Sequence, residues 1–155
     1  MKKTIILSLF LSIFSFQGIA CKCAYLGDFN AKEIEKYDYV ALVRLMDFYP
    51  NEKLDSVKTR EELYYWASIE EKSRFKGESV SKIKIYGGKR EFGYGSSCDF
   101  GMKVGEEWIL FGNSDGNGLL VSPCQRTTLF RNVDGSLVKD YSKVMKKLKK
   151  LKPLE

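Results

Sequence analysis

Four cysteines are the residues with the clearest chemistry in this 155-residue chain: Cys21, Cys23, Cys98 and Cys124. An even number of cysteines in an oxidising compartment indicates two disulfides, and three pairings are possible. A bridge from Cys21 to Cys23 across one residue would be strained, so we expect each to reach Cys98 or Cys124, in one order or the other. A structural metal site is disfavoured because the C-x-x-C spacing of such sites is absent.

Histidine is absent from the whole sequence. This excludes Ser-His-Asp and Cys-His catalysis, His-ligated zinc and imidazole proton shuttles. Adjacent acids occur at Glu70 and Glu71 and at Glu106 and Glu107, but neighbouring residues on a strand point to opposite faces. Neither pair can therefore converge on one substrate as acid and base, and we expect no enzyme activity and no cofactor.

Residues 1–20 have the features of a secretory signal peptide. Lys2 and Lys3 open the segment, residues 5–16 are mainly apolar, and the small residues Gly18 and Ala20 precede Cys21. No stretch approaches the roughly 20 apolar residues that cross a bilayer. We expect cleavage before Cys21, a secreted or periplasmic protein, and one domain over residues 21–155.

Five segments have the apolar or alternating pattern of β-strands. The third carries isoleucines that alternate with lysines, and residues 113–118 form the turn of a hairpin between the last two. The segments are 38–48, 63–75, 80–86, 106–111 and 119–124.

Two helices are expected beside these strands. Asn30 followed by Glu33 is an N-terminal capping pattern, with Ile34 and Tyr37 facing inward. An amphipathic C-terminal helix follows from apolar residues spaced three and four apart, with lysines between them. These apolar residues are Leu137, Tyr141, Val144, Leu148 and Leu151.

This order of elements favours an all-β fold with flanking helices. We expect a five-stranded OB-type barrel with a short N-terminal helix and an amphipathic C-terminal helix, because closure removes the edges that five strands would expose. A five-stranded sandwich is the competing architecture.

The chain resembles the netrin-like module, and within it the N-terminal domain of the tissue inhibitors of metalloproteinases (TIMPs). The residues that carry the resemblance are Cys21-Lys22-Cys23, the strand ending in Phe75-Lys76-Gly77, Cys98 after a glycine-serine loop, the strand Glu107-Trp108-Ile109-Leu110, and Cys124. The similarity extends from Cys21 through the C-terminal helix. It implies disulfides between Cys21 and Cys98 and between Cys23 and Cys124.

The resemblance also implies a function, the inhibition of zinc metalloproteases. In the inhibitors, the α-amino group and carbonyl of the N-terminal cysteine chelate the protease zinc, and Cys21 is the matching residue. Such a chelate displaces the zinc-bound water that acts as nucleophile. Lys22, Cys23, Ser96, Ser97 and Cys98 would complete the inhibitory ridge around Cys21.

Three features depart from the inhibitors. The second mature residue is small in that family but is Lys22 here, and desolvating its ammonium in an apolar pocket is costly. The second, disulfide-rich domain of the family and its additional cysteine near the first strand are absent. We therefore expect a target protease whose pocket is acidic or open.

Two other interpretations stay open. Cys21 follows Gly18-Ile19-Ala20, so it could be the lipidated residue of a lipoprotein, although the leucine usual at position 18 is missing and three cysteines would remain. The chain would then be a noncatalytic extracellular or lipid-anchored cell-envelope binding module.

The lysines of the C-terminal helix form a cationic face on a chain of formal net charge +6. Such a face is usually solvated, but it permits contact with an anionic polysaccharide or lipid. Tyr64, Trp66 and Tyr86 could stack on nucleic-acid bases, but export argues against that partner, and packing explains them more simply. We expect a monomer that binds no nucleic acid.

Overall fold

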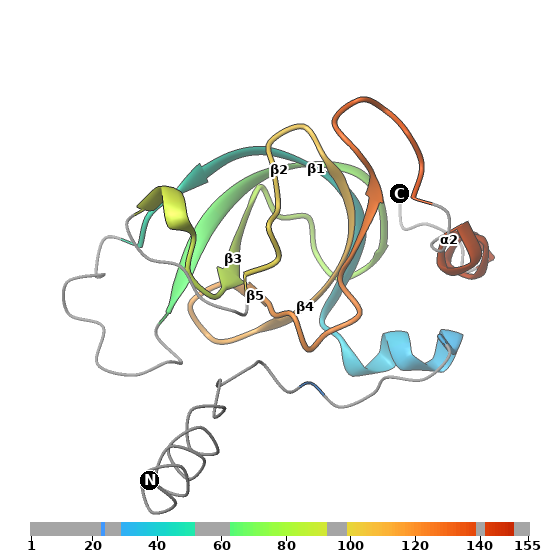
Figure 1. Cartoon of the computed structure of the whole chain (residues 1–155). Coiled ribbons are helices and arrows are strands. Elements are labelled where there is room, and N and C mark those ends of the chain that lie inside the picture. The colour runs from blue at the N-terminus through green and yellow to red at the C-terminus, as the bar shows by residue number, and fades with distance from the viewer. Residues whose placement is uncertain (1–22, 24–28, 52–62, 93–98, 139–141, 151–155) are drawn as a thin grey trace, which may run out of the picture.

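A computed structural model describes most of the chain after the predicted signal peptide (Figure 1). The described residues are 23, 29–51, 63–92, 99–138 and 142–150. They form the strands β1 (Tyr39–Tyr49), β2 (Tyr64–Lys76), β3 (Lys82–Tyr86), β4 (Glu107–Ser114), β5 (Leu119–Val121) and β6 (Thr128–Arg131). The helical elements are the 3₁₀ turns η1 (Ala31–Lys36) and η4 (Arg90–Phe92) and the α-helix α2 (Ser142–Lys149).

The sheet closes into a barrel. Its strands follow the order β1-β2-β3-β5-β4, and β4 pairs with β1 to complete the circle, while β6 adds to β4 outside it. All pairings are antiparallel except that of β3 with β5. This closed five-stranded barrel of mixed direction is the OB-type architecture that the sequence predicts, and the competing sandwich is wrong.

Strand β1 is buried on both faces from Tyr39 to Val43, which explains the continuous apolar sequence there. Tyr39, Ala41 and Val43 point into the barrel and belong to its interior core. Val40 and Leu42 point outward into a second core, whose other members are Phe29, Ile34, Tyr37, Phe75, Ile109, Phe111, Met145 and Leu148. The N-terminal segment and α2 therefore cover one side of the barrel, as Figure 1 shows for η1 (light blue, lower right) and α2 (dark red, right).

A bulge at Met46 changes the phase of β1. The register with β2 shifts between Leu45 and Asp47, and Met46 is 49% exposed. Odd-numbered residues face the interior before the bulge, but after it Phe48 packs against the interior core. Tyr49 consequently lies on the outer face.

The end of the sheet differs from the sequence prediction in three respects. Asn113 and Ser114, assigned to a turn, extend β4, because both pair with β5. The fifth strand ends at Val121, so Cys124 lies in a turn and not in a strand. Strand β6 was not predicted, since its four residues have no clear alternation, and only Thr128 among them is buried.

The C-terminal helix is shorter than its predicted pattern. Leu137 is outside α2, where it forms an isolated bridge with Arg131 and is 56% exposed. Met145, which the prediction omitted, is buried beside Leu148. The predicted positions Tyr141 and Leu151 lie outside the described residues.

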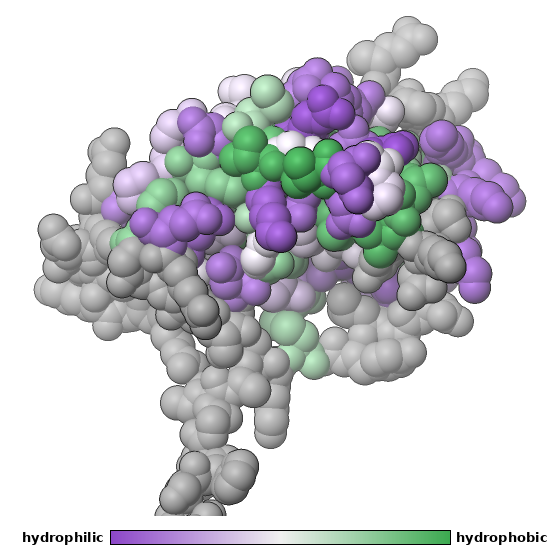
Figure 2. All heavy atoms as spheres, turned by 45° about the horizontal axis from the view of Figure 1, so that its top comes forward, coloured by the Kyte–Doolittle hydropathy of each residue, from purple (hydrophilic) through white to green (hydrophobic). Residues whose placement is uncertain are grey.

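Some large apolar residues remain exposed on the surface. Figure 2 brings forward the side that is at the top of Figure 1 and shows apolar residues gathered between hydrophilic ones. Within the described ranges, the exposed large apolar residues are Met46, Tyr49, Val104, Val133 and Leu137. No helix among the described residues is long and apolar enough to span a membrane.

Candidate functional site

The predicted inhibitory ridge is described only at Cys23. The other ridge residues lie outside the described ranges: Cys21, Lys22, Ser96, Ser97 and Cys98. The structure joins Cys23 to Cys124 by a disulfide, with the two Cα atoms 4.9 Å apart. Cys124 is the partner that the resemblance gives to Cys23, and the pairing of Cys21 with Cys98 falls outside the described residues.

The strand directions define the end of the barrel at which this disulfide lies. Strands β3 and β5 are parallel, with Ile85 opposite Val121, so both point to the same end. Cys124 follows β5 by three residues, and the segment that continues toward Cys98 begins at Gly87, directly after β3. Strand β1 is also directed to this end, because it runs antiparallel to β2, which runs antiparallel to β3. The disulfide is therefore attached at the end where three connections leave the barrel.

The turn that carries Cys124 is fixed by its own hydrogen bonds. The main-chain N–H of Ser122 donates to Oε1 of Gln125 at 2.7 Å, and that of Gln125 donates to the carbonyl of Ser122 at 3.0 Å. The N–H of Cys124 donates to the hydroxyl of Ser122 at 3.3 Å. Cys23 is thus bonded to a turn with defined geometry.

Tyr65 on β2 contacts both ends of the segment that contains Ser96, Ser97 and Cys98. On one side, the Phe92 ring lies 6.2 Å from the Tyr65 ring, edge to face. On the other side, the Tyr65 hydroxyl donates to Oδ1 of Asp99 at 3.3 Å. Because Tyr65 is fully buried, both flanks of this segment are held by the barrel interior.

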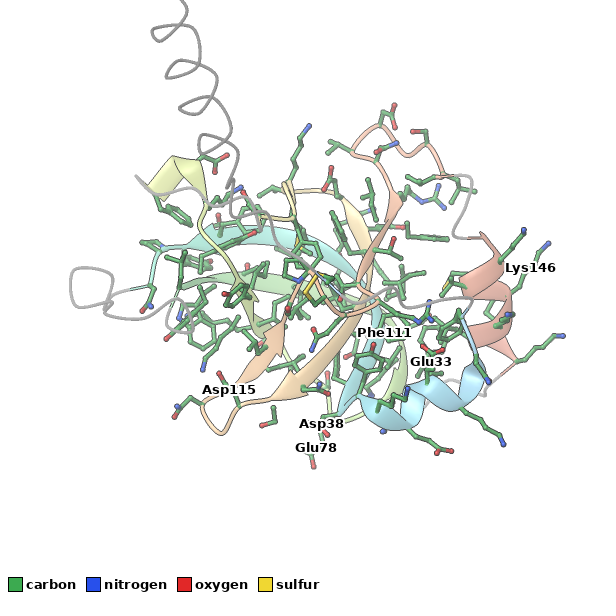
Figure 3. All side chains as sticks on the ribbon, turned by 60° about the horizontal axis from the view of Figure 1, so that its bottom comes forward. Glu33, Asp38, Glu78, Phe111, Asp115 and Lys146 are labelled. Atoms are coloured by element: carbon green, nitrogen blue, oxygen red, sulfur yellow. A yellow bond between two sulfur atoms is a disulfide. The ribbon has the colours of Figure 1, made fainter. Side chains whose placement is uncertain are left out.

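The chain between Cys23 and β1 is held against the barrel by an aromatic contact and an ion pair. Phe29 packs edge to face on Phe111, with ring centroids 5.8 Å apart. The Arg126 guanidinium lies over the Phe29 ring. It also forms a bidentate ion pair with the Glu33 carboxylate, in which Nη2 is 3.0 Å from Oε1 and Nε donates to Oε2. Figure 3 shows Glu33 and Phe111 at this side of the barrel.

This ion pair affects the titration of Glu33. The hydrogen bond from Arg126 is the main reason that the pKa of Glu33 lies below its ordinary value, and it outweighs the opposing effect of burial.

The predicted N-terminal cap of η1 is present, since Oδ1 of Asn30 accepts from the N–H of Lys32 at 3.1 Å. Ile34 and Tyr37 are buried, as the sequence predicts. Burial raises the pKa of the Tyr37 hydroxyl.

The Phe75-Lys76-Gly77 sequence fastens the same segment from β2. Phe75 is in the outer core, and the Lys76 ammonium donates to the carbonyls of Ile34 and Glu35, each at 3.1 Å. Gly77 has φ of +88°, and a Cβ placed there would lie 2.4 Å from the carbonyl oxygen of Asp38. Only glycine fits this close approach. The motif was recognised in the sequence, but its anchoring role was not.

Helix α2 supplies a further anchor. The Lys147 ammonium donates to the carbonyl of Phe29 at 2.6 Å. Lys147 was predicted only as part of a cationic face, because an exposed lysine that reaches a distant carbonyl leaves no pattern in the sequence. Lys146 on the same helix points outward in Figure 3.

The two acids of each adjacent pair bind different partners, as their neighbouring positions in the sequence predict. Glu106 accepts from the indole N–H of Trp108 at 3.0 Å, whereas Glu107 pairs with Arg44 and Arg131, both at 3.1 Å. Glu70 pairs with Lys72, and Glu71 pairs with Arg74 and accepts from the Tyr39 hydroxyl. Burial, helped by this bond to Glu71, raises the pKa of Tyr39 far above its ordinary value. In the described parts of the chain, no cluster of three metal-ligating residues occurs.

No family model matches the chain, and no curated protein matches it.

Proposed function

We propose that the exported chain begins at Cys21 and inhibits zinc metalloproteases through the free α-amino group and the carbonyl of that residue. The zinc of such a protease has three protein ligands and an exchangeable water. An amine with an adjacent carbonyl takes the position of that water and removes the nucleophile. The partner is therefore a zinc metalloprotease, and this chain is not an enzyme itself.

The observation that carries the proposal is the disulfide between Cys23 and Cys124. It attaches the chain two residues after Cys21 to a hydrogen-bonded turn at one end of the barrel. Because the disulfide fixes the chain only two residues from the N-terminus, Cys21 loses little conformational entropy when it enters a protease cleft. The α-amino group also titrates near about 7.7 to 8.0, so zinc can bind its unprotonated form at neutral pH.

The anchors downstream of Cys23 support the same proposal. Arg126 and Lys147 bind Glu33 and Phe29, and Lys76 binds the carbonyls of η1. These contacts come from the turn after Cys124, from α2 and from β2. Three separate elements therefore anchor the N-terminal segment to the barrel.

Lys22 sets the expected choice of protease. Its ammonium would enter the pocket that receives a small residue in the inhibitors, so the preferred target has an acidic or open pocket. Replacing Lys22 by Ala should shift inhibition toward proteases with apolar pockets.

The test compares three forms of the chain against a panel of zinc metalloproteases. One form begins at Cys21, the second has one alanine added before Cys21, and the third has one alanine added after Glu155 as a control. We expect inhibition by the first and third forms and none by the second, because the added residue moves the amine off the zinc. Equal inhibition by all three forms would refute zinc chelation by Cys21.

The exported form is defined by its intact mass, measured with and without reduction. A chain that starts at Cys21, without an acyl group and with two disulfides, fits the proposal and a secreted or periplasmic location. A lipid-sized increment on Cys21 would block the amine. The chain would then be a lipid-anchored binding module, the second function that the sequence leaves open.

A further inference from the structure

The outer face of β1, β2 and β3 carries a row of aromatic and basic side chains. Tyr49 on β1 is opposite Trp66 on β2, and Trp66 is opposite Lys84 on β3. Directly opposite residues share a face of a sheet, and the interior positions on these strands belong to Tyr65, Ala67, Ile83 and Ile85. This row, with Lys82 and Tyr64 beside it, is the aromatic-lysine face.

The centre of this face is rigid. The Lys84 ammonium is bound to both carboxylate oxygens of Asp115, at 2.9 and 2.8 Å, and lies 5.4 Å from the centre of the Trp66 ring. The Lys84 side chain is only 3% exposed, whereas a lysine that alternates with isoleucines on a strand is usually solvated. Its burial is possible because Asp115 and the aromatic rings compensate the charge. Trp66 and Lys84 are thereby held in place.

The turn between β4 and β5 closes one side of the face. A Cβ at Gly118 would lie 3.4 Å from Cη2 of Trp66 and 3.5 Å from Cε of Lys84, so the turn packs directly on both. Burial opposes ionisation of Asp115, but bonds from Lys84 and from the N–H of Asn117 outweigh it and lower the pKa of this carboxyl. Figure 3 shows Asp115 on this turn, on the other side of the molecule from Lys146.

Lys82 differs from Lys84 because its charge is not neutralised. Its ammonium lies 4.6 Å from the centre of the Trp66 ring and 5.4 Å from that of Tyr49. Lys82 is exposed, Tyr49 is 41% exposed, and no carboxylate of the described residues forms a salt bridge with Lys82. Asp47 on β1 lies in the same cross-strand row as Lys82. Ser68 on β2 stands between the two residues and pairs with both. The face therefore presents a cation between two aromatic rings.

We propose that this face binds an acidic oligosaccharide. The carboxylate of a sugar pairs with the Lys82 ammonium, and the C–H side of the sugar ring lies on Tyr49. Charge complementarity favours the carboxylate, because Lys82 is an unneutralised cation between the rings of Tyr49 and Trp66. The corresponding face of OB-type barrels, over the second and third strands, is suited to oligosaccharides as well as oligonucleotides.

Two other ligands fit the face less well. A peptide strand would need an open sheet edge, but β1, β2 and β3 each pair on both sides. A nucleic-acid strand requires a line of basic residues along its phosphates and open ring faces. Here Lys84 is neutralised by Asp115, so the row leaves Lys82 and offers no line of cations along a strand of phosphates.

The test measures binding of a galacturonate oligomer by calorimetry, with a neutral galactose oligomer and oligothymidylate as comparison ligands. The variants are K82Q and Y49A on the face and K146Q on α2, a matched loss of one charge far from it. K82Q should weaken galacturonate binding by about tenfold, Y49A should weaken it too, and K146Q should leave it unchanged. Unchanged unfolding midpoints in urea would show that the variants are folded.

Several results would overturn the proposal. One is galacturonate binding that survives K82Q but is weakened by K146Q, which would assign it to α2. Equal binding of the neutral oligomer would remove the role of the carboxylate, and tighter binding of oligothymidylate would make this a nucleic-acid face. Absence of any galacturonate binding would also contradict it. None of these results bears on protease inhibition, which the proposal does not require.

Discussion

The guanidinium of Arg126 pairs with the carboxylate of Glu33 across the boundary between the N-terminal segment and the turn after β5. Arg126 is two residues beyond Cys124, whose sulfur is bonded to Cys23. The same two stretches of chain are therefore joined twice, once by a covalent bond and once by an ion pair. Both side chains of the pair are largely buried, with 11% and 19% exposed.

Loss of this pair should lower stability in a pH-dependent way. E33Q removes the charge and leaves the Arg126 guanidinium without its partner, which should cost about 1 kcal/mol of unfolding free energy at neutral pH. The folded pKa of Glu33 lies below the ordinary value of 4.5, so the stabilisation is complete above that value and disappears as pH falls through the folded pKa. Urea unfolding of both proteins from pH 7 to pH 2 measures the difference.

K72Q is the matched control for E33Q. Lys72 pairs with Glu70, but the two side chains are 31% and 49% exposed, so the pair contributes little. We expect no measurable change in stability for K72Q. A difference between E33Q and the parent protein that persists at the lowest pH would contradict the assignment to the ionised carboxylate.

The disulfide between Cys23 and Cys124 should be a major source of stability. It joins residues separated by 101 positions, and its removal in C23S/C124S should cost about 2–5 kcal/mol. The double replacement avoids leaving one free thiol. Thermal unfolding with and without a reductant provides the measurement, and a variant as stable as the parent protein would show that the noncovalent anchors suffice.

Gly77 should be the least replaceable glycine of the described chain. G77A forces a Cβ to within 2.4 Å of the Asp38 carbonyl oxygen in a left-handed conformation, so we expect a loss of about 3 kcal/mol. G116A is the control, because Gly116 has a similar φ of +82° but open space around it. It should cost about 1 kcal/mol, the backbone strain alone. Equal losses in the two variants would mean that the close approach to Asp38 has no effect.

Much of the barrel could be predicted from the sequence because alternation and apolar runs record burial directly. The nearly continuous apolar run in 38–48 predicts a strand, and β1 is indeed buried on both faces from Tyr39 to Val43. The phase change at Met46 was not predictable, because a bulge is defined by pairing with β2 and not by local sequence. Leu137 misled the helix prediction for a similar reason, since helical spacing also occurs by chance in a β-bridge.

The residues that hold the candidate site were harder to predict than its cysteines. Cys23 and Cys124 stand out by their residue type. The contacts of Lys76, Arg126 and Lys147 connect residues 42, 93 and 118 positions apart, and no local pattern reports such distances. The burial of Lys84 was not predictable, because its partner Asp115 comes from a turn 31 residues away. Lysine in an alternating strand is otherwise a sign of solvent exposure.

The most direct test of the inhibitory mechanism observes the protease metal itself. A zinc metalloprotease from the panel is substituted with Co²⁺, whose visible absorption reports the ligands of the metal. Adding the chain that begins at Cys21 should change this spectrum in a one-to-one titration, because an amine and a carbonyl replace water. The form with one added alanine should leave the spectrum unchanged. Inhibition by the Cys21 form with an unaltered cobalt spectrum would contradict the account.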